Sequence, residues 1–187
     1  MRVTRKQAAA NREKVLDVAG TLFRERGFEG IGVADIMKRA GLTHGGFYGQ
    51  FASKDDLAAE TTARVLDKTG WPKRLTGNAD PSFGEVVGAY LSPRHRDDPG
   101  TGCLISAVGS DAARQPRAVR RALTDGFRAQ IGALMKLVQG RSQAARREKA
   151  LATMASLVGA LILSRAVDDP ALSDEILEAT ATELGRR

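Results

Sequence analysis

The tightest constraint on the fold of this chain comes from residues 41–57, which read GLTHGGFYGQFASKDDL. The preceding residues 33–40 place apolar side chains at intervals of three and four, on one face of a two-turn helix. Gly41 supplies the left-handed residue at which such a helix ends. Thr43 is placed to cap a second short helix, and Ser53 begins a capping-box pattern that starts a third. Two short helices joined by a turn that contains glycine predict a helix-turn-helix, whose second helix lies in the major groove of DNA.

The same segment carries a family signature. Its anchors are Gly41, Leu42, Thr43, Phe47, Tyr48, Phe51 and Lys54. In this pattern the chain resembles the TetR family of bacterial transcriptional regulators, and the resemblance covers about the first third of the sequence. It implies an N-terminal DNA-binding head and a helical body that binds a ligand and forms a homodimer. The implied function is that of a repressor that a small molecule releases from its operator.

Three positions depart from the family pattern. Gly45 and Gly46 lie inside the short recognition helix, where each glycine costs about 1 kcal/mol relative to alanine. They either let the backbone approach DNA closely or leave this helix dependent on tertiary packing. Gly32 stands where the family commonly has Ser or Thr to cap the preceding helix, and it offers only its backbone.

Several side chains of the segment are candidates for DNA contact. We expect the ring of Tyr48 to pack on the helix-turn-helix core while its hydroxyl reaches a phosphate; the alternative is a core tyrosine. Lys54 is expected to contact a phosphate from the first turn of its helix, unless it is an ordinary surface lysine. Thr43 can donate to a phosphate besides capping, and Gln50 can do so in place of the family's usual His or Tyr. His44 is the candidate for a base-edge contact, because N-terminal residues of a recognition helix meet the bases. The predicted DNA-binding set is Thr43, His44, Gly45, Gly46, Tyr48, Gln50 and Lys54.

The charge of the chain favours a polyanionic partner. It has 29 Lys and Arg residues against 22 Asp and Glu residues, a net charge of +7 and a sequence pI of about 10.0. The basic residues of segment 1–14 are Arg2, Arg5, Lys6, Arg12 and Lys14, against the single acidic Glu13. Beside a recognition motif this arm is placed for phosphate contact, and its alternative is a solvated, disordered terminus.

The apolar runs and the single cysteine indicate the cellular compartment of the protein. Charged residues open the chain and no apolar h-region follows, so we expect no secretory signal. The uncharged run 150–164 is shorter than the ~20 residues of a membrane span, and we expect it to be a buried helix of a soluble protein. Cys103 is the only cysteine, which excludes an intramolecular disulfide and fits a cytoplasmic location.

Apolar periodicity predicts an all-α chain of about nine helices. We expect a first helix that ends at Gly27, the helix-turn-helix behind it, and a helix from Ser53 that links head and body. Helices are also expected near 83–91, 103–113, 116–140, 142–167 and from 170 onward, with loops at 70–81 and 92–102. The predicted domains are a DNA-binding domain, 1–52, and a ligand-binding and dimerisation domain, 53–187. There is no strand-like alternation and no internal repeat.

The body is expected to enclose an apolar cavity for an unknown small-molecule inducer. Its candidate lining is Trp71, Phe83, Tyr90, Cys103, Leu104 and Phe127. Cys103 lies at the predicted start of a helix, where the dipole favours thiolate, and Arg94, His95 and Arg96 can add positive potential. The segment Gly102-Cys103-Leu104 is similar to one in TetR-family members that sense electrophiles or oxidants. The alternative is a buried cysteine that acts as a small hydrophobe.

The last two helices combine apolar side chains with small residues, which permits close helix packing. The family resemblance implies that two chains join them in a four-helix bundle. Leu157 and Leu161 are the expected interface residues. The alternative is a core within one chain.

Other function classes are weakly supported by the residues. His44 and His95 are far apart, the single cysteine has no metal-ligand spacing, and neither a phosphate-binding glycine loop nor a nucleophile motif is present. The sequence therefore predicts no enzyme, no metal and no cofactor. Charge alone also allows a non-specific nucleoid-associated protein, which would show no preferred operator.

Overall fold

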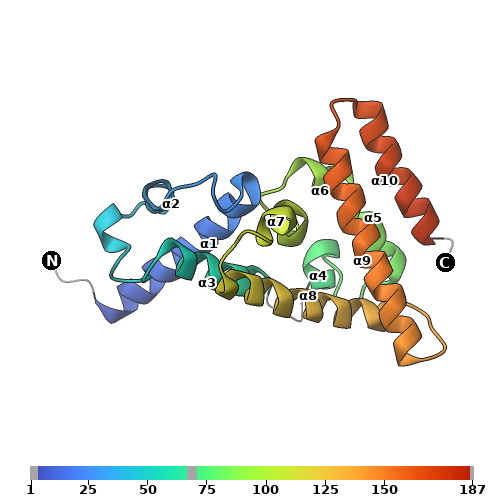
Figure 1. The fold of residues 1–187 in the computed structure, drawn as a ribbon, viewed down its shortest axis with the longest axis horizontal. Coiled ribbons are helices and arrows are strands. Elements are labelled where there is room, and N and C mark those ends of the chain that lie inside the picture. The colour runs from blue at the N-terminus through green and yellow to red at the C-terminus, as the bar shows by residue number, and fades with distance from the viewer. Residues whose placement is uncertain (1–3, 67–70, 186–187) are drawn as a thin grey trace.

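A computed structural model describes residues 4–66 and 71–185, and every regular element in these ranges is helical (Figure 1). The elements are α1 (Arg5–Arg26), α2 (Val33–Arg39), the 3₁₀ helix η1 (His44–Gly46), α3 (Lys54–Leu66), α4 (Trp71–Thr76), α5 (Phe83–Tyr90), α6 (Pro93–Asp97), α7 (Leu104–Ala112), α8 (Arg117–Leu137), α9 (Gln143–Ala166) and α10 (Pro170–Gly185). The all-α expectation is confirmed. Arg2 of the basic arm and Gly70 of the expected loop 70–81 lie outside the described residues.

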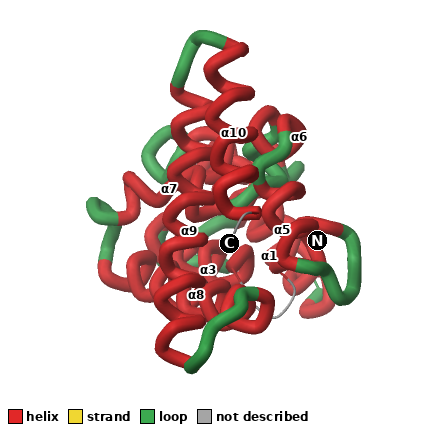
Figure 2. The backbone as a smooth tube through the Cα atoms, turned by 90° about the vertical axis from the view of Figure 1, so that its right-hand side faces the viewer, coloured by secondary structure: helices red, strands yellow, loops and turns green. Residues whose placement is uncertain are grey.

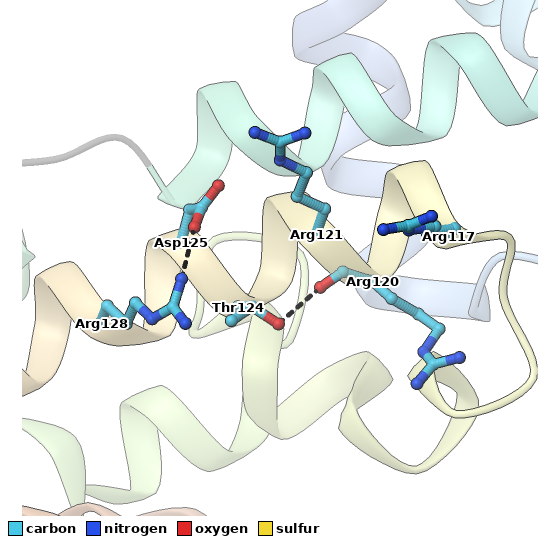
Figure 3. Close-up of a pocket in the computed structure, with 6 residues that line it drawn as sticks. All are labelled: Arg117, Arg120, Arg121, Thr124, Asp125 and Arg128. Atoms are coloured by element: carbon cyan, nitrogen blue, oxygen red, sulfur yellow. Dashed lines mark hydrogen bonds and ion pairs between the residues drawn. The ribbon is translucent and has the colours of Figure 1, made fainter.

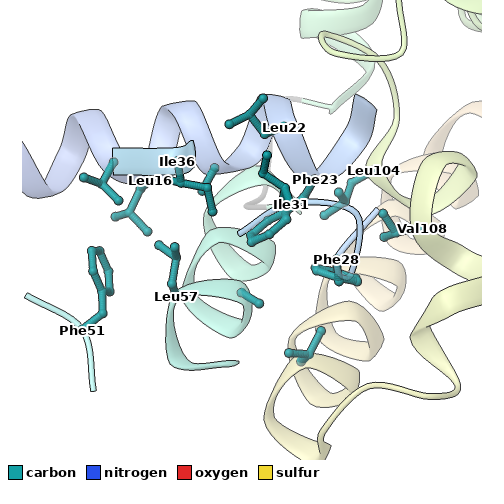
Figure 4. Close-up of a cluster of buried hydrophobic side chains, with 14 of the residues drawn as sticks. Leu16, Leu22, Phe23, Phe28, Ile31, Ile36, Phe51, Leu57, Leu104 and Val108 are labelled. Atoms are coloured by element: carbon teal, nitrogen blue, oxygen red, sulfur yellow. The ribbon is translucent and has the colours of Figure 1, made fainter. Parts of the chain in front are cut away.

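Helices α1, α2 and α3 form a head at one end of an elongated molecule, and α9 and α10 lie at the other (Figure 1). Phe23 and Phe28 are buried in the core of the head beside Leu104 and Val108, with ring centroids 5.1 Å apart (Figure 4). Leu57 of α3, Leu104 of α7 and Val119 of α8 complete this core. Helices beyond residue 52 therefore contribute to it, and the division of the chain into domains 1–52 and 53–187 stays a prediction.

Two of the helices were expected to be loops. Helix α4 lies within the expected loop 70–81, and its Pro72 is the second helical residue, in the first turn where proline is tolerated. Helix α6 lies within the expected loop 92–102, where the Ser92 hydroxyl accepts from the His95 amide at 3.2 Å and Pro93 is the first helical residue. Both predictions failed because helices this short leave no apolar period to detect.

Helix α9 agrees with the helix expected at 142–167. It has 24 residues and is the one helix in the described ranges that is long and apolar enough, by length and composition alone, to cross a membrane. It packs between α8 and α10, and α10 returns beside it (Figure 2). Only 39% of its most apolar window is buried within the chain, so one face of α9 is open.

The expected dimer residues are not on that open face. Leu157 and Leu161 are completely buried in a second core, together with Trp71, Tyr90 and Leu177. Their selection as interface residues was wrong, because apolar spacing marks a buried side of a helix without showing which neighbour buries it. The large apolar side chains that α9 and α10 expose are Leu151, Ile162, Leu163 and Leu172.

Candidate functional site

The turn between α2 and the recognition element has the backbone that Gly41 predicts. Its φ of 68° lies in the left-handed region that favours glycine. The Gly41 amide donates to the Lys38 carbonyl at 3.0 Å, and the Leu42 amide donates to the Met37 carbonyl at 2.9 Å. This pair of bonds is the Schellman motif, which satisfies carbonyls at the end of α2 and directs the chain into residues 43–51.

The recognition element itself is shorter and tighter than the expected helix. Only His44, Gly45 and Gly46 form the 3₁₀ helix η1, and turns carry the chain on to Phe51. Thr43 occupies the N-cap position but its side chain makes no capping hydrogen bond, so the cap predicted for its hydroxyl is absent. Glycine has low helix propensity, so a segment with two successive glycines is not stable as a helix by itself. Packing of Phe47 holds it in place.

Phe47 is the anchor of the recognition element. It is completely buried and stacks on Phe51 with ring centroids 5.5 Å apart. The adjacent Tyr48 points the other way and is 66% exposed. Its ring meets Phe47 edge-on at 5.2 Å and His44 edge-on at 5.9 Å. The alternative of a core tyrosine is therefore wrong, and an exposed aromatic surface of His44 and Tyr48 lies above the buried phenylalanine.

The remaining residues of the predicted DNA-binding set lie around this surface. Thr43 and Gly45 are exposed, and a methyl group added at Gly45 would meet nothing within 4 Å. Gln50 is half-buried and donates to the Gly46 carbonyl at 3.1 Å, which ties it to the turn. The Lys54 ammonium lies 3.7 Å from a Glu29 carboxylate oxygen, and Glu29 is exposed.

Capping and ion pairs fix α3 behind the recognition element. The Ser53 hydroxyl accepts from the Asp56 amide at 3.0 Å, and Asp56 accepts from the Ala52 amide at 3.2 Å, which confirms the cap predicted at Ser53. Arg12 of α1 forms a forked ion pair with Glu60 of α3, and its guanidinium lies 4.6 Å from the centre of the Phe51 ring. Arg12 thus braces the head, a role that its place in a basic arm did not indicate.

The expected ligand residues meet in the core of the body, with one exception. Trp71, Tyr90 and Cys103 are buried there, and Phe83 and Phe127 pack against them. Leu104 is the exception, because it packs into the core of the head. Trp71 and Tyr90 meet edge-on with ring centroids 6.2 Å apart.

His95, which the sequence predicts to lie in a charged loop, is buried and bonds two residues of this core. The His95 Nδ1 lies 2.7 Å from the Tyr90 carbonyl, and the Cys103 amide donates to His95 Nε2 at 2.9 Å. Nδ1 must therefore carry the proton, because Nε2 accepts. Burial lowers the pKa of His95, so this side chain is neutral near pH 7 and adds no positive potential to Cys103, contrary to expectation.

Two further groups surround this histidine. Tyr90 is completely buried, and its hydroxyl lies near Cys103 and Ser106 but makes no hydrogen bond of normal geometry within residues 4–66 and 71–185. Burial, reinforced by the neighbouring Cys103 side chain, raises the pKa of Tyr90 well above its usual value. Arg165 of α9 donates to the His95 carbonyl at 2.6 Å and to the Arg96 carbonyl at 2.9 Å. Arg96 in turn bonds Ser173 and Asp174 of α10.

Hollows on the surface lie elsewhere. One of about 500 Å³ runs along the exposed face of α8 and is lined by Arg117, Arg120, Arg121, Thr124, Asp125 and Arg128 (Figure 3). Another of about 340 Å³ lies beside Arg96, Arg165 and Ser173. Both are open to solvent and lined mostly by charged and polar residues, and neither is the apolar cavity expected in the body between Trp71 and Leu137.

The sequence matches to known proteins lie mainly in the head. A family model described as bacterial regulatory proteins, tetR family, matches residues 15–61. The repressor KstR2 of Mycolicibacterium smegmatis is 36% identical over 90 residues, which cover 48% of this chain and 44% of KstR2. The regulator AcrR of Shigella flexneri is 39% identical over 59 residues, which cover 32% of this chain and 27% of AcrR. The chain thus spans less than half of either relative.

Solved structures extend the likeness to the whole fold. The reduced form of Escherichia coli NemR superposes with a TM-score of 0.75 at 20% identity, over 95% of this chain and 96% of NemR. A TetR transcriptional regulator from Chloroflexus aurantiacus gives the same TM-score at 20% identity, over 97% of this chain and 98% of that one. At this identity the likeness establishes the fold alone.

Proposed function

Since this chain belongs to the TetR family of bacterial regulatory proteins, we propose that it is a sequence-specific DNA-binding transcriptional regulator of the cytoplasm, a repressor that a small molecule releases from its operator. The observation that carries this proposal is the recognition element. A buried Phe47 holds it, and His44 and Tyr48 stand out from it into solvent. An exposed aromatic and imidazole surface beside a capped helix start suits a groove edge and the phosphates that flank it.

The residues divide by the kind of contact they make. His44 reads a base edge, because it begins the recognition element. Tyr48 and Lys54 bind phosphates, Lys54 by exchanging its long ion pair with exposed Glu29 for the DNA backbone. Thr43, whose hydroxyl is not used as a cap, donates to a phosphate as well. Gly45 leaves room for the sugar-phosphate backbone, whereas a Cβ atom at Gly46 would lie 3.6 Å from Thr43 and 3.7 Å from Met37 within the head. Gln50 shapes the turn through its bond to Gly46.

The protein acts as a homodimer joined by the open face of α9 and α10. Leu151, Ile162 and Leu163 stand exposed on α9, with Ala155 and Ser156 between them. Large apolar side chains exposed on one helix face favour association with a second copy, because a symmetric pair covers the exposed faces of both chains at once. Two heads then read two halves of a near-palindromic operator, one helical turn or a multiple apart.

The signal enters through the core of the body. An inducer there would contact Trp71, Tyr90 and the half-buried Phe83 and Phe127, and Leu104 is no longer a candidate because it belongs to the core of the head. The unpartnered Tyr90 hydroxyl favours a ligand that offers a hydrogen-bonding group to it. Binding releases DNA only if the ligand prefers the dimer whose heads have the wrong spacing.

A second candidate for the signal is chemical modification of Cys103. Its observation is the position of Cys103 at the N-cap of α7, beside the phenol of Tyr90. Cys103 is buried, so a reagent must enter the same core as a non-covalent inducer. We propose no enzymatic reaction, metal or cofactor for this chain.

Selection of bound sequences from a random DNA pool tests the regulator. We expect enrichment of one near-palindrome with an affinity far above that for unrelated DNA. A non-specific nucleoid protein would enrich nothing, and that result would overturn the proposal.

A further inference from the structure

We propose that Arg24 and His95 are positioning residues for the DNA-binding head, joined through the loop 98–102. Arg24 lies near the end of α1, and its Nε donates to the Gly100 carbonyl at 2.6 Å. Helix α2 and the recognition element follow α1 in the chain. The hydrogen bond from Arg24 to Gly100 therefore braces the end of α1 against the body. The inference rests on the proposed function for its DNA readout, although the contact exists in the free protein.

The loop is held from the body side by the imidazole. His95 Nε2 accepts from the Cys103 amide at 2.9 Å, just where the loop passes into α7. Thr101 closes the loop on itself by donating to Asp98 at 2.7 Å. The approach is so close that a Cβ atom at Gly102 would lie 2.8 Å from the His95 ring. The position of His95 therefore sets the position of Gly100, and Gly100 is the acceptor for Arg24.

His95 is itself fixed by elements that carry the proposed signal and the proposed dimer interface. Its Nδ1 donates to the Tyr90 carbonyl, and its ring meets the Tyr90 ring edge-on at 4.7 Å. Arg165 of α9 bonds the His95 carbonyl at 2.6 Å. A displacement of Tyr90 or α9 must move His95 or break one of these bonds, and either change reaches Arg24 through the loop.

The apolar contacts between head and body differ in kind from this link. Leu104 and Val108 of α7 pack against α1 whatever the exact angle of the head, since dispersion contacts are weakly directional. A hydrogen bond from a guanidinium to a carbonyl is directional and charge-assisted. We infer that packing holds the head on the body and that the Arg24 link selects its orientation. Without the link the dimer must find the DNA-compatible orientation on binding, which lowers the apparent affinity.

Paired variants separate this role from a purely structural one. In His95→Gln the side-chain amide can place an oxygen near the Nε2 position and still accept from the Cys103 amide. In His95→Asn the shorter amide reaches the Tyr90 carbonyl but not the loop. Both substitutions bury one amide in place of one imidazole. For Arg24→Ala the matched control is Arg26→Ala, which removes the same charge from the same turn of α1 at an exposed position.

The full-length dimer is titrated with its selected operator at several salt concentrations. We expect Arg24→Ala and His95→Asn to bind roughly tenfold more weakly, and Arg26→Ala and His95→Gln to bind like the parent. The double variant Arg24→Ala with His95→Asn should be no weaker than Arg24→Ala alone, because both break one link. Equal losses for the two His95 variants, or losses that add, would overturn the proposal. A flatter salt slope for Arg24→Ala would also do so, since it would make Arg24 a direct phosphate contact.

Hydrogen exchange of the free dimer tests the link without DNA. Peptides that cover the end of α1 and the Cys103 amide should exchange faster in Arg24→Ala and His95→Asn, and at the parent rate in the two controls. If the parent binds no operator but these exchange differences appear, the proposed function fails while the positioning link stands. If the parent binds an operator and all variants exchange alike, the link fails and the proposed function stands.

Discussion

At the exposed rim of the head, the residue proposed to read a base and the lysine proposed to bind a phosphate lie on different elements. His44 begins the recognition element and stands beside Tyr48, whereas Lys54 begins α3 and pairs with exposed Glu29. The buried Phe47 packs edge-on against Tyr48 and anchors the recognition element. Substitutions at the rim should therefore change binding while leaving the stability of the head nearly unchanged.

The first prediction concerns these two residues. His44→Ala should lose discrimination at one base position, on the order of 1–3 kcal/mol for a good base contact. Lys54→Ala should weaken binding to all sequences alike and lower the salt slope by about 1. Tyr48→Phe should also weaken binding to all sequences alike, but it should leave the salt slope unchanged. Fluorescence anisotropy against a set of single-base operator variants measures both. A His44→Ala protein that ranks every variant as the parent does would remove His44 from base readout.

The second prediction is a pH dependence from His95. Burial lowers its pKa in the folded protein below the ordinary 6.5, so the unfolded chain binds more protons between the two values. The contribution of His95 to stability is complete above pH 6.5 and is lost as the pH falls through the folded pKa. Urea unfolding at pH 7.5 and at lower pH measures it, and His95→Gln should have a flatter profile than the parent. The charged and titratable groups that face His95 are Arg165, Asp98, Tyr90 and Cys103.

At the scale of secondary structure, α9 has one buried face and one exposed face. Leu157 and Leu161 point into the core of the same chain, and Leu163, 56% exposed, lies on the open face. The buried face contributes to folding, and the exposed face is the one proposed for assembly. The recognition element has the opposite character, since its geometry depends on Phe47 more than on the helix propensity of its own residues.

The third prediction follows from the two faces of α9. Leu157→Glu should unfold or precipitate the chain, because a charge would enter a closed apolar core. Leu163→Glu should leave a folded, soluble chain that fails to dimerise and loses cooperative operator binding. Light scattering and circular dichroism distinguish the two outcomes. A Leu163→Glu variant that remains a dimer would move the interface off this face.

The fourth prediction concerns the recognition element. Gly45→Ala meets open space and requires no left-handed backbone, so it should stabilise the protein by about 0.4–1 kcal/mol through the unfolded chain. If Gly45 lies against DNA as proposed, the same methyl group should weaken operator binding. Urea midpoints and operator titrations measure the two effects. Tighter binding together with greater stability would show that glycine is not needed for close approach.

Across the whole molecule, the head and the core of the body meet along α8, whose N-terminal half packs in one core and whose C-terminal half packs in the other. The core of the body therefore joins the head through apolar contacts as well as through the hydrogen bond from Arg24 to Gly100. Two such molecules joined through α9 and α10 would convert a change in head orientation into a change in the spacing of two recognition elements.

The fifth prediction separates the two candidate signals. A thiol-reactive electrophile is added to the protein bound to operator DNA, with Cys103→Ser as the comparison. If Cys103 is the covalent target, the parent should release DNA and the variant should hold it. Equal behaviour of the two proteins would assign Cys103 to packing and leave a non-covalent inducer as the signal.

The sequence by itself determined three local features of the head, although not the short 3₁₀ form of the recognition element. The turn at Gly41, the end of α1 at Gly27 and the cap at Ser53 are decided by bonds between residues no more than five positions apart. Such features can be predicted because the residues that satisfy the backbone are adjacent in sequence. The all-helical class followed in the same way, since the apolar period of a long helix is visible without its neighbours.

Only the tertiary structure decided what each helix face meets. Apolar spacing put Leu157 on a buried face but did not distinguish a core within the chain from an interface between chains. His95 belongs to a segment rich in charge, yet it is a buried, neutral group. Hydrogen bonds with Tyr90, Cys103 and Arg165 hold it there. Arg24 finds its acceptor 76 residues away. Such partners are brought together by the packing of whole helices, which the spacing of residues along the chain does not encode.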